Sequence, residues 1–463
     1  MSEKFIIADR DQMSLLPYDL RNWVPKDDIV HFIIEAVENI PTKHFKVNSR
    51  GTGDAQYHPH LMLTLLVYCY TNGIFGSRRI ERATYSDIYV RFICANTHPD
   101  YSTICRFRRD NEKAISETFL HVLTLAKELN ILKVGTVSVD GTKLRANANI
   151  DKNVRYDRAC QLEKQLEIDI KDLMAKAETC DNTDDNDNRK LPEEISRREK
   201  LREKMAQAQR KLEKRAELRH QEIQNRHSKN IAEWEKDKTS GHKPKVTTSK
   251  PEPKPENQMN LTDEDSRLMR KSTRSEFQQA YNAQAVVDAD GSQLVLSARI
   301  STCANDFNEL VLDVQSIPTQ LGKPLKVLAD SGYATGCEVR ALQKDNIEVF
   351  VPVRDGSNNS NNERRRYDYR PEKQPKELRK TESKDNGDQT EPWVKDMSAK
   401  MKLPEVKNQY KKRKQSVETV FGIIKQAMGF RQFLTRGVKN VKNEWNLVVV
   451  AYNFRRLYRL INI

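Results

Sequence analysis

Apolar residues recur at helical spacing through the first 130 residues of the chain. The run at 29–40 follows Asp27 and Asp28, and acidic residues in this place favour the start of a helix. A second run at 60–70 is rich in leucine. The pattern predicts an all-helical N-terminal domain over residues 1–130.

Basic residues gather in the last helix that this pattern indicates between 77 and 111. Two short helices and a turn at 98–100 come first, and the next helix carries Arg106, Arg108 and Arg109. This order resembles a helix-turn-helix whose third element contacts DNA. A small helical domain with surface arginines would show the same pattern, so both interpretations stay open.

A strand pattern first occurs at 136–139, where valines alternate with polar residues. Asp140 and Gly141 follow at once. A buried strand that ends in Asp-Gly can be the start of a plain hairpin turn. It can equally deliver a carboxylate to a site at the end of the strand.

The same design recurs at 325–330, where an apolar run ends in Asp330. The other patterns in this part of the chain are a hairpin of strands at 277–288 and 293–300, a helix opened by Asp306, a helix at 338–344 and a strand at 347–353. For Asp306 we favour a helix cap, although it could also line the site. The order of strands and helices fits a mixed α+β or α/β fold with a ribonuclease-H-like sheet.

Residues 151–260 interrupt this core with a polar and charged insertion. Helix-forming runs flank the acidic segment 181–188, and 240–258 has the Pro and Lys content of a linker. One run has a heptad seam made by Leu201, Met205, Ala208 and Leu212. We predict an antiparallel helical hairpin or coiled-coil arm, which could clamp DNA, pair subunits or act as a spacer.

The catalytic core is then predicted to comprise residues 131–150 and 261–463. Within it, 354–408 is rich in Asn, Ser, Lys and Glu, and we expect a flexible loop there. From Tyr410 onward the pattern is helical, with a break at Gly437 before a last, buried helix.

Charge is unevenly distributed over the chain. The net charge is +14 and the pI is near 9.2, while residues 401–463 hold 14 basic and three acidic side chains. Such a localised positive surface favours a polyanionic partner such as nucleic acid, although a merely soluble basic surface would also explain it. Seven scattered cysteines, an N-terminus without a signal sequence and short apolar runs predict a soluble, cytosolic protein with no membrane partner.

A third carboxylate, Glu418, lies in a strongly patterned helix. It borders an apolar stripe formed by Val417, Val420, Phe421, Ile424 and Met428. Lys411, Lys414 and Lys425 lie on its own face of the helix, which suits metal and phosphate together. An exposed glutamate paired with lysines remains the alternative.

Two strand-borne aspartates and one helix-borne glutamate can hold two hard cations. Mg²⁺ (or Mn²⁺) prefers carboxylate oxygen, and two such ions can activate a nucleophile and relieve charge on the leaving oxygen of a phosphodiester. These residues therefore predict a metal-dependent enzyme that cleaves and joins nucleic-acid strands.

Three stretches carry a family resemblance: VSVDGTKL, VLADSGY and YKKRKQSVETVFGIIKQAMGFRQFLTRG. They resemble the acidic motifs of DDE transposases of bacterial insertion sequences, and the N-terminal stretches YDLRNWVPKDD and PDYSTICRFRRDN resemble the helical domain of one subgroup. The resemblance covers most of the chain outside 151–260 and 354–400. It implies that Asp140, Asp330 and Glu418 are the catalytic, metal-binding residues.

The resemblance also implies contacts to DNA. Lys425 has the family's spacing from Glu418, and Tyr410 and Arg413 match the residues that precede it. The family places three residues between that arginine and the glutamate, whereas four separate Arg413 from Glu418 here. Helix geometry favours Lys414 on the glutamate face, so either side chain could take the basic role. Residues 338–463 lack the cysteines of many relatives, so no zinc element is expected.

The function that this resemblance implies is a cut-and-paste transposase. It would bind the terminal inverted repeats of its element and join them to target DNA, as a homodimer on paired ends in the bacterial nucleoid. Two alternatives stay open, a ribonuclease-H-like nuclease that only hydrolyses and a non-catalytic DNA-binding scaffold protein.

Overall fold

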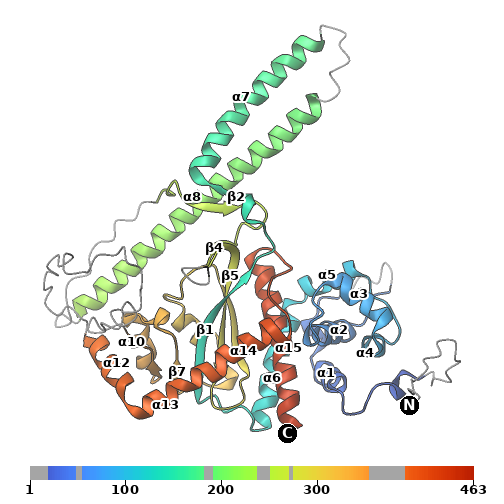
Figure 1. The fold of residues 1–463 in the computed structure, drawn as a ribbon, viewed down its shortest axis with the longest axis vertical. Coiled ribbons are helices and arrows are strands. Elements are labelled where there is room, and N and C mark those ends of the chain that lie inside the picture. Colours follow the sequence, from blue (N-terminus) through green and yellow to red (C-terminus); the bar gives the residue numbers. More distant parts are fainter. Residues whose placement is uncertain are drawn as a thin grey trace, which may run out of the picture.

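The structure of the protein is a computed structural model that describes residues 19–47, 55–181, 191–236, 251–270, 275–353 and 392–462. It combines a group of N-terminal helices, a β-sheet and a long helical arm that projects away from the sheet (Figure 1). The protein is therefore a mixed α+β protein, as the sequence predicts.

The described part of the N-terminal region is helical, as predicted. Asp28 caps the first long helix by accepting a 2.9 Å hydrogen bond from Val30 N, and Asp100 caps the basic helix α5 through Thr103 N. The elements are η1 (Leu20–Asn22), α1 (Ile29–Glu38), η2 (Thr42–His44), α2 (Pro59–Thr71), α3 (Ser77–Ser86), α4 (Ile88–Ile93), α5 (Tyr101–Asp110) and α6 (Glu112–Glu128).

Among the described residues, six strands form one mixed sheet in the order β4-β5-β1-β7-β8, and β6 also pairs with β5. These strands are β1 (Thr136–Arg145), β4 (Arg267–Met269), β5 (Gln278–Asp288), β6 (Val295–Ser301), β7 (Lys326–Leu328) and β8 (Glu348–Phe350). β1 is antiparallel to β5 and parallel to β7, and β7 is parallel to β8. The short strands β2 (Asn153–Arg155) and β3 (Gln258–Asn260), with η3 (Ile150–Lys152) before them, pair separately.

Strand β1 is longer than the sequence predicts, because it continues past Asp140. The antiparallel partner β5 holds it as far as Arg145, which lies opposite Ala280. The parallel partner β7 ends earlier, where Ser138 lies opposite Leu328. Asp140 therefore lies two residues beyond the last parallel pairing, and in the described part of the chain it has a strand partner on the β5 side only.

The predicted hairpin of β5 and β6 is confirmed, with a closing hydrogen bond of 2.9 Å from Asp288 N to Leu294 O. The helix after it differs from the prediction. α9 (Leu310–Gln315) begins four residues beyond Asp306, with Glu309 at its N-cap, so Asp306 is not the cap of that helix. η5 (Thr319–Leu321), η6 (Ser331–Tyr333) and α10 (Gly336–Lys344) complete this part of the chain.

The arm consists of α7 (Tyr156–Asp181) and α8 (Leu191–Lys236). Met205, Ala208 and Leu212 of the predicted seam are buried, whereas Leu201 is 41% exposed. The buried residues pack with Ala159 and Leu166 of α7. The acidic segment from 182 to 188 and the linker from 240 to 250 lie outside the described residues.

The prediction of a flexible loop over 354–408 is wrong for the end of that segment, which is helical. Residues 354–391 lie outside the described residues, but 392–402 and 404–408 are helical. Trp393, Met397 and Met401 recur every four residues and pack against the main core, so an apolar stripe stabilises the first of these helices. The elements here are α12 (Pro392–Lys402), α13 (Pro404–Arg413), the π-helical turn η8 (Lys414–Glu418), α14 (Thr419–Gly422), the π-helical turn η9 (Ile423–Ala427) and α15 (Val438–Ile461).

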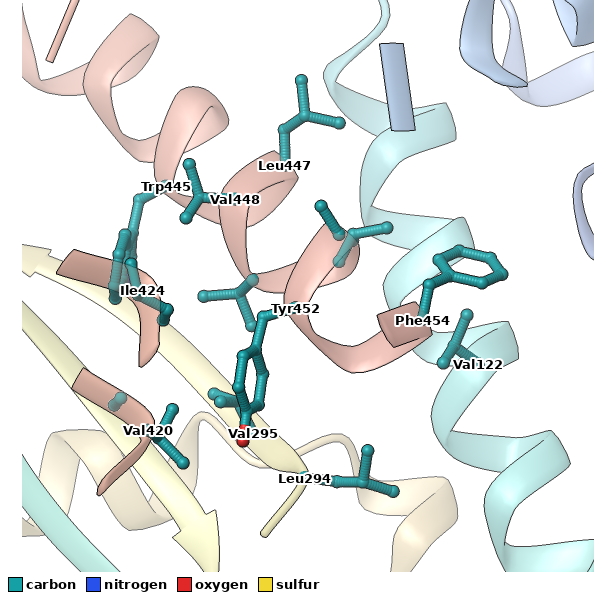
Figure 2. Packing of buried hydrophobic residues seen from close by; sticks show 14 of the residues in the cluster. Val122, Leu294, Val295, Val420, Ile424, Trp445, Leu447, Val448, Tyr452 and Phe454 are labelled. Carbon is teal, nitrogen blue, oxygen red and sulfur yellow. The ribbon is translucent and has the colours of Figure 1, made fainter. Parts of the chain in front are cut away.

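Helix α15 lies at the centre of the main core. Figure 2 shows Tyr452 pointing toward Leu294 and Val295, and Phe454 beside Val122 of α6. A helix that is buried on most of its sides joins its neighbours into one core, and here it links the N-terminal helices to the sheet. In the described part of the chain, every helix is too short or too polar to cross a membrane.

Candidate active site

Asp140 lies on β1 with a mostly buried carboxyl group, since its side chain is only 19% exposed. Gly141 N donates a 2.9 Å hydrogen bond to Asp140 Oδ1. Burial raises the pKa of Asp140 to about 6, although the charge of Arg413 and the Gly141 N–H act in the opposite direction. An ionised carboxylate in this position therefore needs a cation close by.

Asp330 follows β7, which is the parallel neighbour of β1. Ser138 pairs with Leu328, and each strand delivers its aspartate two residues after that pair. Ser331 N donates a 2.7 Å hydrogen bond to Asp330 Oδ1, and the Asp330 side chain is 54% exposed. Adjacent parallel strands thus carry the two aspartates to the same edge of the sheet, as a shared site requires.

Glu418 ends a π-helical turn that begins after Arg413. In an α-helix, residues five apart differ by about 140° in direction, because each residue turns by about 100°. A π-helix places residue i+5 about one turn above residue i. The turn therefore compensates for the extra residue in the spacing, and Arg413 Nη1 lies 2.9 Å from Glu418 Oε1.

Arg413 is the centre of the cluster. Its other terminal nitrogen, Nη2, lies 2.9 Å from Asp140 Oδ2 and 3.9 Å from Asp330 Oδ2. Its side chain is only 9% exposed. Burial opposes a charged guanidinium, but the surrounding acids outweigh it and raise the pKa of Arg413. The three carboxylates predicted from the sequence thus face one buried cation.

The donor set fits hard divalent cations, because it offers only carboxylate oxygens from three rigid segments. Among the described residues, however, no three acidic, histidine or cysteine side chains are close enough to hold a metal ion as they lie. Arg413 stands between the carboxylates and keeps them apart. Three acids against one guanidinium leave an excess of negative charge, and a divalent cation would neutralise it.

The tyrosine and the lysines of this helical segment that were predicted to contact DNA differ in their surroundings. Tyr410 donates a 3.1 Å hydrogen bond to Ala329 O, directly before Asp330, and burial is the main reason that the pKa of Tyr410 rises to about 12. Lys425 Nζ donates to Thr142 Oγ1 and lies 3.4 Å from Lys143 O on β1. Lys411 and Lys414 are exposed to solvent. Arg413, rather than Lys414, is therefore the basic residue beside Glu418.

The predicted DNA-contacting arginines of α5 do not all reach the surface. Arg106 and Arg109 are exposed. Arg108 is buried, and its Nη1 donates a 2.8 Å hydrogen bond to Tyr70 Oη and a 3.3 Å bond to Phe75 O. Arg108 therefore holds the N-terminal helices together and is not available to contact DNA.

A polar cluster that the sequence analysis did not predict lies behind Asp140. Asn282 and Gln284 of β5 each donate a 2.8 Å hydrogen bond to Asp306 Oδ1, beside Gly141. Alternating polar residues in the buried strand 278–288 were the available signal, because such a strand normally carries apolar side chains.

A hollow of about 430 Å³ opens beside the Asp330 turn. Ser331 and Gly332 form one wall of it, so a group bound there would lie next to the candidate site. The remaining lining residues are Phe307, Ala334, Pro352, Val353, Trp393 and Val394.

Two family models match parts of the chain. One is described as a transposase domain (DUF772) and matches residues 18–110, and the other is described as a transposase DDE domain and matches residues 369–458. The second match contains Arg413 and Glu418, whereas Asp140 and Asp330 lie outside both. No curated protein and no solved structure matches the chain.

Proposed function

We propose that this protein cleaves the ends of its element and joins them to target DNA, and the two family matches support a DDE transposase of an insertion sequence. In the joining step each freed 3′-hydroxyl would attack a phosphodiester of the target, form a new phosphodiester bond and displace a 3′-hydroxyl of the target strand. The proposed catalytic residues are Asp140, Asp330 and Glu418. The observation that carries the proposal is their convergence on Arg413 from three distant parts of the chain. A structural ion pair needs one acid for one base, whereas this cluster has a surplus of acids.

We propose a ribonuclease-H-like core for this activity. Its support is the mixed sheet, in which β1 lies between an antiparallel neighbour, β5, and a parallel neighbour, β7. The helical segment from Tyr410 to Ala427 packs against this sheet and delivers Glu418 to the aspartates.

Asp140, Asp330 and Glu418 would hold Mg²⁺ or Mn²⁺, two ions in the proposed active state. When bound, such ions activate the attacking oxygen and stabilise the leaving one. Arg413 would give up its contacts with the acids. Its planar guanidinium is suited to a phosphate oxygen of the DNA backbone, so the same side chain would serve the free protein and the complex.

The surrounding residues would orient these groups and hold DNA. Tyr410 fixes the backbone before Asp330 through its bond to Ala329 O. Lys425, anchored on β1 beyond Asp140, would direct its charge toward a phosphate. Exposed basic side chains would extend the DNA contact, and we assign this role to Lys411, Lys414, Arg106 and Arg109.

Pairing of two ends by a homodimer in the bacterial cytoplasm is part of the same proposal. Two inverted repeats present equivalent binding sites, and a symmetric dimer would bind one with each subunit. The arm of α7 and α8 projects from the sheet and would be available to DNA or to a second subunit (Figure 1).

The experiment that tests this function uses labelled DNA ends of the element, incubated with the full-length protein and Mg²⁺, Mn²⁺ or EDTA. Cut positions at the ends, and joined products from pre-cleaved ends, are expected only with a metal ion. Cleavage without joining would favour a hydrolytic nuclease. Binding without any metal-dependent cleavage would favour a non-catalytic DNA-binding protein.

A further inference from the structure

Asp306 lies between β6 and α9, next to the backbone that carries Asp140. Its Oδ1 accepts hydrogen bonds of 2.8 Å from Asn282 Nδ2 and from Gln284 Nε2. Both amide side chains are fully buried on β5. Gln284 also lies directly opposite Gly141 in the strand pairing. The carboxylate of Asp306 is thus fixed against β1 by two neutral donors.

The close contact with Gly141 shows how little space separates Asp306 from the catalytic strand. A methyl group on Gly141 would lie 2.6 Å from Asp306 Oδ1 and 2.8 Å from Asn282 Oδ1. A side chain at this position would have to displace these side-chain atoms, so the polar cluster packs directly on the peptide unit that follows Asp140.

The same cluster reaches the second aspartate through Tyr333. Tyr333 is fully buried, and its hydroxyl donates to Gln284 Oε1. Tyr333 N donates a 3.0 Å hydrogen bond to Asp330 O, which closes the turn after β7. A methyl group on Gly332, within this turn, would lie 3.7 Å from Asp306 Oδ2.

Two features indicate that this cluster does more than fill space. Asn282 Oδ1 is buried and has no hydrogen-bond partner in the described part of the chain, although it points toward Gly141. The carboxylate of Asp306 also lies against the residue that follows Asp140, since a methyl group on Gly141 would be 2.6 Å from Asp306 Oδ1, so its negative charge is close to that aspartate.

We propose that Asp306 is a positioning residue of the active site. It sets the distance between Asp140 and the Asp330 turn through Gln284 and Tyr333, and its charge strengthens the attraction of the site for divalent cations. This inference rests on the proposed function, because it assumes that the two aspartates hold a metal ion.

The test measures Mn²⁺ binding to the full-length, DNA-free protein by the loss of the free Mn²⁺ signal in electron paramagnetic resonance. Asp306→Ala removes both the acceptor and the charge, and should weaken Mn²⁺ binding by roughly 10- to 100-fold, as loss of outer-shell partners does at other metal sites. Asp306→Asn keeps the shape and one acceptor oxygen, so it should weaken binding less. Tyr333→Phe breaks only the link to the Asp330 turn and should also weaken binding.

Asp345→Asn is the matched control, because Asp345 is exposed and its carboxylate lies 3.6 Å from Lys323 on the surface. Melting curves of each variant report folding. If Asp306→Ala fails to fold, the Mn²⁺ affinities of Asp306→Asn and Tyr333→Phe are compared with that of the unchanged protein instead. Mn²⁺ affinity in these folded variants within about twofold of the unchanged protein would overturn the inference.

Asp140→Asn separates this inference from the proposed function. If Asp140→Asn loses Mn²⁺ binding while the Asp306 and Tyr333 variants keep it, only the role of Asp306 is wrong. If Asp140→Asn binds Mn²⁺ as the unchanged protein does, the proposed metal site itself is wrong, and the inference is overturned with it.

Discussion

Arg413 on the C-terminal helical segment donates to Asp140 on the sheet, with 2.9 Å between Nη2 and Oδ2. The pair joins two segments that lie 273 positions apart in the sequence. Because the other terminal nitrogen of Arg413 contacts Glu418, one guanidinium fixes the helix carboxylate relative to the strand carboxylate.

Removal of Arg413 should destabilise the protein, because its positive charge offsets the repulsion among the three carboxylates that it contacts. Arg413→Ala leaves the buried carboxylate of Asp140 beside Asp330 and Glu418, and loss of one partner of a buried ion pair typically costs about 3–5 kcal/mol. We expect a lower melting temperature at neutral pH and a larger recovery by Mg²⁺ than in the unchanged protein. Lys412→Ala, which removes a half-exposed contact to Asp290, is the control. Equal responses to Mg²⁺ in the two variants would contradict the prediction.

The π-helical turn makes a prediction about spacing. Deletion of Gln415 leaves three residues between Arg413 and Glu418, and an α-helix then brings them onto one face. We expect the deletion variant to fold and to retain metal-dependent cleavage. Insertion of one alanine after Gln415 rotates Glu418 away and should abolish cleavage. Cleavage by the insertion variant together with loss of cleavage in the deletion variant would show that the π-helical turn does not align Arg413 with Glu418.

The arginines of α5 should separate into two classes. Arg108→Ala removes buried hydrogen bonds to Tyr70 and Phe75, so it should destabilise the protein by about 1–3 kcal/mol in urea unfolding. Arg106→Ala and Arg109→Ala should leave stability within about 0.5 kcal/mol. Each should weaken binding to DNA and reduce the salt dependence of that binding by about one phosphate contact. Unchanged DNA binding by both Arg106→Ala and Arg109→Ala would exclude α5 as a DNA contact.

Asp313 should make stability depend on pH. It is almost completely buried, and burial raises its pKa to about 7 although Arg299 opposes the shift. A carboxyl group whose pKa is higher in the folded than in the unfolded state stabilises the fold at low pH. That contribution is lost as the pH rises through the interval from the ordinary value of 3.8 to about 7.

Asp313→Asn mimics the protonated form, so its stability relative to the unchanged protein should increase between pH 4 and pH 8. Urea unfolding at both pH values measures this difference, which should approach about 4 kcal/mol at most. A constant difference across this range would show that Asp313 does not carry the effect.

Much of the candidate site could be predicted from the sequence, because the strand patterns indicate which aspartate follows each buried strand. Asp140 and Asp330 each follow an apolar run, and parallel pairing of the two strands brings them together. Glu418 could be chosen from its position at the edge of an apolar stripe. These inferences depend on local periodicity, which the sequence displays directly.

Other features depend on packing between distant segments, and the sequence does not display them. The π-helical turn decides between Lys414 and Arg413, which the sequence left open, because an assumed α-helix favours Lys414 beside Glu418 whereas the turn brings Arg413 there. Arginine is usually a surface residue, but Arg108 is buried and donates a hydrogen bond to Tyr70 of another helix. The position of Asp306 in the sequence favours a helix cap, but in the structure its carboxylate accepts hydrogen bonds from Asn282 and Gln284.

The roles of the three carboxylates are tested by a comparison of Asp140→Asn, Asp330→Asn and Glu418→Gln with the unchanged protein. Each variant is assayed for binding to labelled element ends and for Mg²⁺-dependent cleavage of those ends. We expect all three variants to bind the ends almost normally and none of them to cleave the ends, because each lacks one proposed metal ligand. Normal cleavage by any one of the three folded variants would contradict this expectation.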